Sequence, residues 1–508
     1  MGCLGTLVSL CVMWGLVLIH VHGKSQNKTR NLLLIIADDA GFEMGTYRNK
    51  VCQTPNLDAL AKRSLIFNNA HTSVSSCSPS RSAILTGQPA HQNGMYGLHQ
   101  GVHHFDSLDG VRSLPAVLAR HGVRTGIIGK KHVGPSSVYP FDFAETEENN
   151  SILQVGRNIT RIKLLVREFL ARNKSRPFFL YVAFHDPHRC GHTHPQYGSF
   201  CERFGDGQPG NGRIPDWTPV YYRADQVQLP YFVQDSVAAR NDVAAQYTTV
   251  SRLDQGVGLV LKELRDAGYE DSTLVMYSSD NGIPFAGGRT NLYDPGMAVP
   301  LLVSSPERDG RRGEVTYAMT SLLDVTPTAL DWFGVPAPAR PPLTGRSLLP
   351  LLRREPPPGD ARAVFASHSH HEVTMYYPMR AVRTKLWKLV HNLNYLMPFP
   401  VDQDLYVSAA FQDLLNGTRA GRPLGWYKTL RDYYHRPEWE LYHLKSDGDE
   451  LRNLAGSPDH QAVLSQLKAQ LHGWQQATAD PWLCAPGGVL ESTGAYAKHP
   501  QCLPLDNL

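Results

Sequence analysis

The sequence predicts an α/β fold in which a large domain with a mainly parallel sheet precedes a smaller C-terminal α+β domain with an antiparallel sheet. Between residues 31 and 334, short apolar runs alternate with amphipathic stretches, which is typical of β–α units. The apolar runs are nearly continuous, as expected for strands covered on both faces. A proline-rich connector at 335–359 then separates this region from shorter strand-like segments.

The large domain is expected to contain five apolar strands with helices between them. In the stretch 242–267, apolar side chains recur at steps of three and four residues, which predicts a helix that Gly268 ends. The stretch 162–170 has the same period and stops before Pro177, because the residue before a proline disfavours helical geometry. The five expected strands are Leu32–Ala37, Thr125–Ile128, Phe178–Phe184, Leu274–Ser278 and Pro300–Val303.

The C-terminal domain is expected to hold four short antiparallel strands and one final helix, from about His460 to Trp474. We divide the chain into a signal peptide at 1–23, a catalytic domain at 24–378 and a C-terminal domain at 379–508. The four expected strands are Ala363–Ser367, Met379–Arg383, Trp387–His391 and Glu440–His443.

The N-terminus is typical of a secretory signal peptide. The chain is apolar and uncharged from Leu4 to Ile19 and turns polar before Gly23, a small residue suited to cleavage. An uncleaved signal anchor is the alternative, because no Lys or Arg precedes the apolar run. No later segment is apolar enough to predict a membrane span. Five Asn-x-Ser/Thr sites agree with a secretory route: Asn27, Asn149, Asn158, Asn173 and Asn416.

Charge and cysteine content limit the classes of function. The formal net charge is +4 with no basic stripe, which argues against a nucleic-acid-binding protein. In an oxidising compartment the natural local disulfides are Cys190–Cys201 and Cys484–Cys502. Cys52 and Cys77 would form a third pair or remain two separate thiols.

Polar residues follow four of the expected strands. The strand ends carry Asp38-Asp39, Lys130 with His132, His185 to His188, and Asp280-Asn281. A single Asp after a strand is usually a cap or turn residue. Because sites in open parallel sheets assemble beyond the carboxyl ends of the strands, four such ends together predict a functional site.

The carboxylates and the amide at these strand ends favour a hard metal ion. Asp38, Asp39, Asp280 and Asn281 offer oxygen ligands, which suit Ca²⁺ better than Mg²⁺ because Ca²⁺ accepts looser, higher coordination. Zinc would prefer His and Cys ligands. The alternative is a cluster of acids whose repulsion is relieved by nearby Arg and Lys.

Cys77 is placed to begin a helix. Pro79 suits a first helical turn, where its missing N–H would be unpaired in any case. Free N–H groups and the helix dipole favour an anion at such an end. Arg81 follows four residues later on the same side of the helix. The alternative for an isolated cysteine is a disulfide partner or a small buried side chain.

The run from Cys77 to Gly87, Cys-Ser-Pro-Ser-Arg-Ser-Ala-Ile-Leu-Thr-Gly, resembles the sulfatase signature C-x-P-S-R-x-x-x-L-T-G. The run 129–132, Gly-Lys-Lys-His, resembles the second sulfatase signature, G-K-x-H. This resemblance covers nearly all of the mature chain. It implies the fold shared by sulfatases and alkaline phosphatase. The runs 184–192, 279–285, 288–293 and 369–375 further resemble the heparan N-sulfatase branch of the family.

The resemblance implies a specific chemistry. A formylglycine-generating enzyme would oxidise Cys77 to formylglycine, leaving Cys52 free. Hydrated formylglycine beside one Ca²⁺ per subunit would attack the sulfur of a non-reducing-end N-sulfoglucosamine in heparan sulfate. Cys77 itself would join Asp38, Asp39, Asp280 and Asn281 as metal ligands. The resemblance also implies a lysosomal homodimer.

Each remaining site residue has an expected role. Asp280 would take the proton of the nucleophile, and His188 would protonate the leaving amine. His132 would act as base when sulfate is expelled. Three cations, Arg81, Lys130 and Arg289, would neutralise the sulfate, and Lys130, His188 and Arg289 would bind the substrate.

Three alternatives remain at the level of sequence. An exo-acting O-sulfatase on another glycosaminoglycan would share the nucleophile and the metal. A phosphoester or phosphonate hydrolase would share the fold. An inactive glycoprotein that binds sulfated glycans would retain an unmodified thiol at Cys77.

Overall fold

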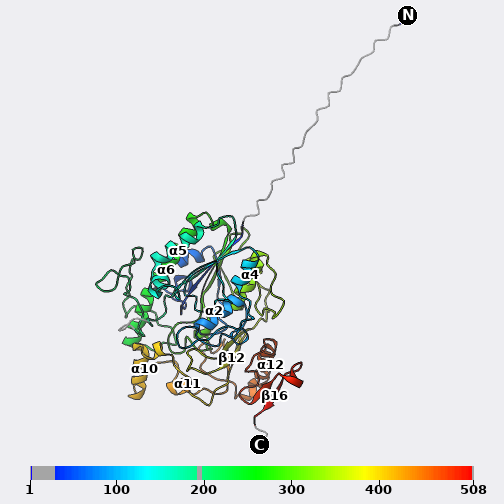
Figure 1. Ribbon diagram of the computed structural model, residues 1–508. Coiled ribbons are helices and arrows are strands. Elements are labelled where there is room, and N and C mark those ends of the chain that lie inside the picture. The colour runs from blue at the N-terminus through cyan, green and yellow to red at the C-terminus, as the bar shows by residue number, and fades with distance from the viewer. Residues whose placement is uncertain (1, 3–28, 192–196, 506–508) are drawn as a thin grey trace.

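The structure is a computed structural model that describes residue 2 and the ranges 29–191 and 197–505 (Figure 1). The predicted signal segment, apart from residue 2, lies outside the described residues, as do Cys3, Cys11 and the glycosylation site at Asn27. None of the described helices combines the length and the apolar character that crossing a membrane requires.

The large domain is built on an eight-stranded sheet in the order β5-β4-β6-β1-β7-β8-β2-β9. The first five strands in this order run parallel, and β8 lies antiparallel to both β7 and β2. The prediction of a mainly parallel sheet is therefore confirmed. The strand bounds are β1 Asn31–Ala37, β2 Leu65–Phe67, β4 Arg124–Gly129, β5 Phe143–Thr146, β6 Phe178–Ala183, β7 Thr273–Ser279, β8 Leu301–Ser304 and β9 Glu314–Thr316.

Helices cover both faces of this sheet, as the continuous apolar strands predict (Figure 1). Alternate residues of β1 point to opposite sides: Leu32 and Leu34 join one buried cluster, whereas Leu33 and Ile35 join another. The first cluster includes α2 (Cys77–Thr86), α4 (Leu114–Arg120) and α8 (Val325–Phe333), and the second includes α1 (Pro55–Ala61), α5 (Ile159–Ala171) and α6 (Val237–Asp266).

The C-terminal part forms a four-stranded antiparallel sheet in the order β11-β12-β13-β14. Its first strand, β11, precedes the predicted domain boundary at residue 379, so the antiparallel sheet draws on both sides of that boundary. The strands are β11 Val364–His368, β12 Met379–Arg383, β13 Trp387–Asn392 and β14 Trp439–His443, and α12 (Gln461–Ala477) packs against them.

Shorter elements complete the fold. Two of them, β3 and β10, pair in parallel, and β15 and β16 form an antiparallel hairpin. Their bounds are β3 Ala70–His71, β10 Thr320–Ser321, β15 Gly488–Glu491 and β16 Gln501–Pro504. The remaining helices are α3 Ala90–Asn93, α7 Asp294–Met297, α9 Gln403–Tyr406, α10 Ala409–Arg419 and α11 Leu430–Tyr434.

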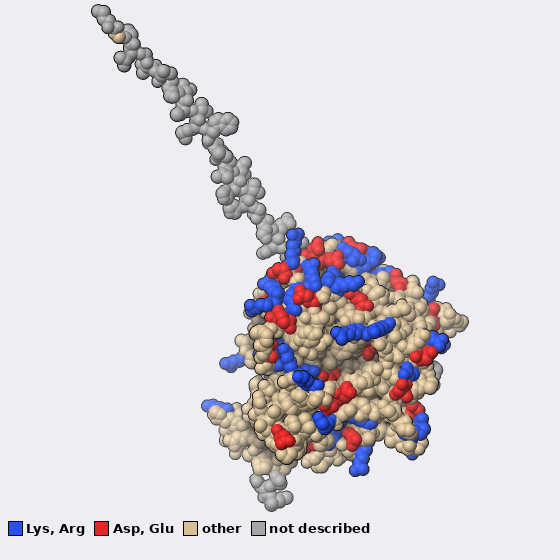
Figure 2. All heavy atoms as spheres, turned by 180° about the vertical axis from the view of Figure 1, so that it is seen from behind, with Lys and Arg blue, Asp and Glu red and all other residues tan. Residues whose placement is uncertain are grey.

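The two predicted disulfides are confirmed. Cys190 bonds to Cys201, and Cys484, which precedes β15, bonds to Cys502 in β16. Cys52 and Cys77 are buried free thiols. On the face shown in Figure 2, Lys and Arg are interspersed with Asp and Glu, in agreement with the small net charge.

Candidate active site

The four polar strand ends meet at one edge of the parallel sheet, as predicted. Asp38 and Asp39 follow β1, Lys130 follows β4, and Asp280 follows β7. Because β1 lies between β6 and β7, its two acidic residues lie centrally at this edge. The Asp39 N–H donates to Asp280 Oδ1 over 3.1 Å, which ties two of the strand ends together.

Three of these acids contact buried cations. Arg81 Nη2 lies 3.1 Å from Asp38 Oδ1, and Arg81 Nε donates to Asp280 Oδ2 over 2.9 Å. Lys130 Nζ contacts Asp38 Oδ2, and Arg289 Nη1 lies 2.6 Å from Asp39 Oδ2. Burial opposes ionisation of Asp38, but Lys130 and other neighbouring cations outweigh it and hold its pKa well below the usual range. The acids are therefore offset by cations from three separate elements.

The same cluster has the donors that a hard cation requires. Oxygen atoms of Asp38 and Asp280 and the Cys77 Sγ lie within 4.8 Å of one another. Asn281 Oδ1 is buried and has no hydrogen-bond partner among the described residues. Burial raises the pKa of Asp280 to about 7. An orphaned amide oxygen beside carboxylates fits a divalent metal ion with oxygen ligands, such as Ca²⁺.

Cys77 is the first residue of α2, as the position of Pro79 predicts. Its side chain is buried, and its Sγ lies 3.9 Å from Asp39 Oδ1. Burial raises the pKa of the Cys77 thiol well above its usual value, and the neighbouring carboxylates add to this effect. A protonated thiol is a poor nucleophile. The environment thus disfavours the thiol itself as the attacking group.

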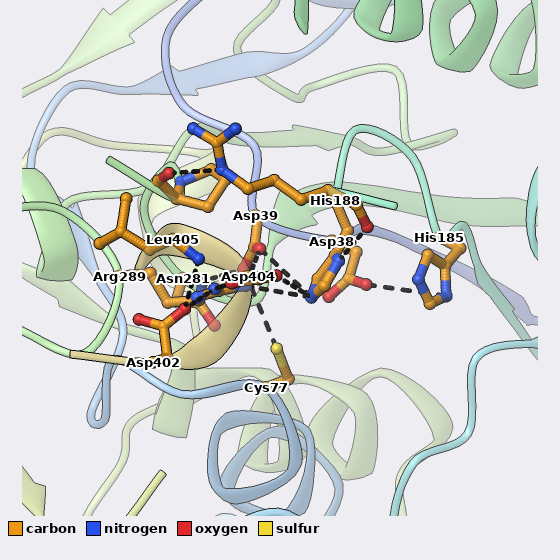
Figure 3. Close-up of polar contacts among 12 residues, drawn as sticks. Asp38, Asp39, Cys77, His185, His188, Asn281, Arg289, Asp402, Asp404 and Leu405 are labelled. Carbon is orange, nitrogen blue, oxygen red and sulfur yellow. Dashed lines mark hydrogen bonds and ion pairs between the residues drawn. The ribbon is translucent and has the colours of Figure 1, made fainter. Parts of the chain in front are cut away.

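His188 and Arg289 both lie next to Asp39 (Figure 3). The His188 Nδ1 lies 2.7 Å from the Arg189 carbonyl, and its Nε2 lies 3.0 Å from Arg289 Nη1 and 3.5 Å from Asp39 Oδ2. Nδ1 therefore donates to the carbonyl, and Nε2 faces the site. Burial lowers the pKa of His188, although Asp39 opposes this shift.

His132 has an unusual backbone and an unsatisfied ring. Its φ of 54° lies in the left-handed region, as does the φ of 57° at Asp39. Both ring nitrogens of His132 are buried without a hydrogen-bond partner among the described residues. Such strained backbone and unpaired polar atoms occur preferentially at functional sites.

A cavity of about 260 Å³ opens above these groups. Cys77, Lys130, His132, His188 and Arg289 line it, so five of the predicted site residues share one cavity. The remaining predicted residues, which are Arg81, Asp38, Asp39, Asp280 and Asn281, are fully buried at its base.

Several functional candidates were missed by the sequence prediction. Glu372, Gln403 and Asp404 line the cavity from the C-terminal side of the chain. Asp402 is buried beside them, and both Asp402 and Asp404 contact Arg289 Nη2. Two signals were present in the sequence: the run 369–375, which contains Glu372, and an Asp-Gln-Asp run at the start of a short helix. The second pattern also predicts an ordinary helix cap, which Asp402 provides by accepting from the Leu405 N–H.

The predicted glycosylation sites within the described residues lie at accessible positions. Asn149, Asn173 and Asn416 are exposed. Asn158 is partly exposed and caps α5 by accepting from the Arg161 N–H.

Comparisons with known proteins agree over almost the whole chain. Residues 30–335 match the family model described as Sulfatase, and residues 288–401 match N-sulphoglucosamine sulphohydrolase, C-terminal. The human N-sulphoglucosamine sulphohydrolase is 63% identical over 497 residues, which cover 96% of this chain and 98% of that protein. An ulvan-active sulfatase of Formosa agariphila is 25% identical and covers 89% of this chain and 80% of its own length.

Solved structures show the same fold at lower identity. A protein solved in complex with D-glucosamine-2-N,6-O-disulfate has a TM-score of 0.62 and 21% identity, and covers 89% of this chain and 99% of its own. A phosphonate monoester hydrolase from Silicibacter pomeroyi has a TM-score of 0.61 and 18% identity, and covers 94% of this chain and 99% of its own. These identities support the fold alone.

Proposed function

This chain belongs to the sulfatase family, and we propose that it hydrolyses the N-linked sulfate of N-sulfoglucosamine at the non-reducing end of heparan sulfate. The observation that carries the proposal is the 63% identity to human N-sulphoglucosamine sulphohydrolase over 96% of the chain. The buried cluster of acids and cations around Cys77 supports it, since it combines a precursor nucleophile with groups suited to an anionic substrate.

The proposed nucleophile is formylglycine made from Cys77. A formylglycine-generating enzyme would act on the signature around Cys77 before folding buries the thiol. The hydrated aldehyde would supply two hydroxyl groups, one to attack sulfur and one to expel sulfate afterwards. A bound Ca²⁺, held by Asp38, Asp39, Asp280, Asn281 and residue 77, would supply positive charge that favours the deprotonated nucleophile.

The residues around position 77 have distinct proposed roles. Asp280 would accept the proton of the attacking hydroxyl, since its carboxylate lies in the same buried cluster as residue 77. Arg81 and Lys130 would stabilise negative charge on the sulfate oxygens. His132, with both ring nitrogens unpaired, would take the proton of the second hydroxyl.

His188 is proposed to protonate the leaving amine through Nε2, the ring nitrogen that faces the cavity. Arg289 contacts that nitrogen and Asp39, and so would align the histidine with the substrate. Because burial lowers the pKa of His188, its protonated form requires an acidic medium. This requirement supports a lysosomal site of action, reached through the secretory pathway. We further propose a homodimer, on the family resemblance alone.

The test is the release of inorganic sulfate by the purified, calcium-loaded protein from glucosamine N-sulfate and from glucosamine 6-O-sulfate. We expect turnover of the N-sulfate and a much lower rate with the O-sulfate. The reverse preference would replace the proposal by an exo-acting O-sulfatase. Mass spectrometry of the peptide that contains Cys77 should show formylglycine; an unmodified thiol without turnover would indicate a glycan-binding protein instead.

Substitution of Cys77 tests the formylglycine mechanism directly. A Cys77→Ser variant has one hydroxyl and cannot expel sulfate without help from water, so multiple turnover should fall by at least about 10³-fold. Full turnover by this variant would refute the formylglycine mechanism.

A further inference from the structure

The active-site cavity has two chemically different sides. Its inner end holds Cys77 with the cations and histidines assigned above to the sulfate. Its outer side holds Glu372 and Asp404, which are two carboxylates, and the amide of Gln403. Glu372 precedes β12, and the other two residues belong to α9, so the C-terminal half of the chain builds this wall.

Carboxylates in a cavity that receives sulfate require an explanation, because like charges repel. Arg289 contacts Asp39 through Nη1 and both Asp402 and Asp404 through Nη2. Of these last two acids, Asp404 is the ionised one: burial and the neighbouring Asp404 raise the pKa of Asp402 well above its usual range, whereas Arg289 outweighs burial and holds the pKa of Asp404 well below it. Asp402 is almost completely buried, whereas the Asp404 side chain is 11% exposed and lines the cavity. Asp404 therefore presents a charged carboxylate to the cavity while it also pairs with Arg289.

Glu372 keeps one acceptor atom free, and hydrogen bonds hold the wall in place. Asp404 uses Oδ1 on Arg289, while its Oδ2 lies 3.9 Å from His188 Nε2, which is too far for a hydrogen bond. Glu372 Oε1 accepts from the Gln403 N–H over 3.1 Å, and its Oε2 has no hydrogen-bond partner among the described residues. The Tyr197 hydroxyl donates to Gln403 Oε1 over 3.1 Å.

Free carboxylate oxygens select donors. A sulfate group has only acceptor oxygens, so this wall cannot bind it, whereas the hydroxyl groups of a sugar ring can donate to it. Asp404 lies beside His188, which we place on the leaving nitrogen. The wall therefore borders the part of the ring next to the carbon that carries the sulfamate.

We propose that Asp404 and Glu372 form a carboxylate wall that binds hydroxyl groups of the terminal sugar ring and so determines specificity for a hydroxylated pyranose. This inference rests on the proposed function only for the identity of the sulfated sugar. The small cavity, of about 260 Å³, suits a single terminal ring, since ligand pockets usually span about 300–1,000 Å³.

The test compares one variant on two ligands. Glu372→Ala removes a wall carboxylate without touching Arg289 or the predicted metal ligands. Its kcat/KM should be measured with glucosamine N-sulfate and with cyclohexylsulfamate, which has a six-membered ring and a sulfamate but no hydroxyl groups. If cyclohexylsulfamate is not cleaved, its constant for competitive inhibition replaces kcat/KM. We expect a loss of about 10- to 100-fold with the sugar, mainly in KM, and less than about 2-fold with cyclohexylsulfamate.

Two further variants distinguish a specific effect of the wall from a general effect of substitution on the protein. Glu372→Gln keeps an acceptor oxygen and should recover part of the lost affinity for the sugar. Glu438→Ala removes a partly exposed carboxylate that does not line the cavity, and should leave kcat/KM for both ligands unchanged. The proposed wall would be overturned if Glu372→Ala lowered kcat/KM equally for both ligands, or did not lower it for the sugar.

Failure of the proposed function can be distinguished from failure of the carboxylate wall. The wild-type protein would then leave glucosamine N-sulfate intact, and the comparison would be made with the O-sulfated sugar that it cleaves. A fall in kcat/KM for that sugar alone in Glu372→Ala would still support the carboxylate wall. An equal fall for cyclohexylsulfamate would still refute it.

Discussion

Glu43 lets the structure predict how the stability of this protein depends on pH. The residue lies five positions after Asp38 in the sequence and is 7% exposed. Glu43 Oε2 accepts from the Gly41 N–H over 3.0 Å, and no described Lys, Arg or His forms an ion pair with this carboxylate. Burial raises the pKa of Glu43 to about 7.

The sign of the effect follows from proton binding. A Glu in an unfolded chain has a pKa of about 4.3, so the folded protein binds the Glu43 proton more tightly. Folding is therefore penalised increasingly as the pH rises from about 4.3 to about 7. With these two values, the penalty is about 1 kcal/mol at pH 5 and about 3–4 kcal/mol at pH 7.5.

Glu43→Gln removes this penalty and keeps an acceptor for the Gly41 N–H. The free energy of unfolding, from urea denaturation with Ca²⁺ held constant, should rise relative to wild type by about 2–3 kcal/mol more at pH 7.5 than at pH 5. The matched control is Glu314→Gln, which removes the charge of a side chain that is 56% exposed. The reasoning is refuted if the Glu43→Gln gain is the same at both pH values.

Three further changes test other parts of the structure. Asp480→Asn would leave the buried guanidinium of Arg380 without its charge partner, and should lower the free energy of unfolding by about 3–5 kcal/mol in urea denaturation. Gly129→Ala would place a Cβ 2.0 Å from the Ala183 carbonyl at a φ of 102°, so we expect at least about 1–3 kcal/mol of destabilisation and reduced kcat through displacement of Lys130. Chelation of divalent metal should abolish sulfate release and lower the melting temperature, and added Ca²⁺ should restore both; unchanged activity in metal-free buffer would contradict a metal site.

The core of the fold could be predicted because burial on both faces leaves a strong pattern. The runs that became β1, β4, β6 and β7 are continuous and apolar, and each strand begins and ends within one residue of its predicted bounds. The edge strands β5 and β9 and the neighbouring strand β2 were missed. They contain only three or four residues, and their mixed burial produces no clear period.

The catalytic end of the site could be predicted for a related reason. Parallel strands deliver the residues that follow them to one edge, so Asp38, Lys130 and Asp280 were brought together by topology alone. Glu372 and Asp404 follow no strand of that sheet. They reach the cavity through packing of the C-terminal part against the large domain, and no local pattern in the sequence encodes that contact.

The separation between the strand-end residues and the carboxylate wall explains how one fold can serve different substrates. The sulfatase family model ends at residue 335, and proteins of only 18–21% identity retain the fold, including a phosphonate monoester hydrolase. The strand ends hold the groups to which we assign the transfer of sulfate, whereas Glu372 and Asp404 come from beyond that region. Arg289 contacts both parts, through Asp39 on one side and Asp402 and Asp404 on the other. Substitution of the carboxylate wall can therefore change which sugar is accepted while the chemistry at position 77 stays the same.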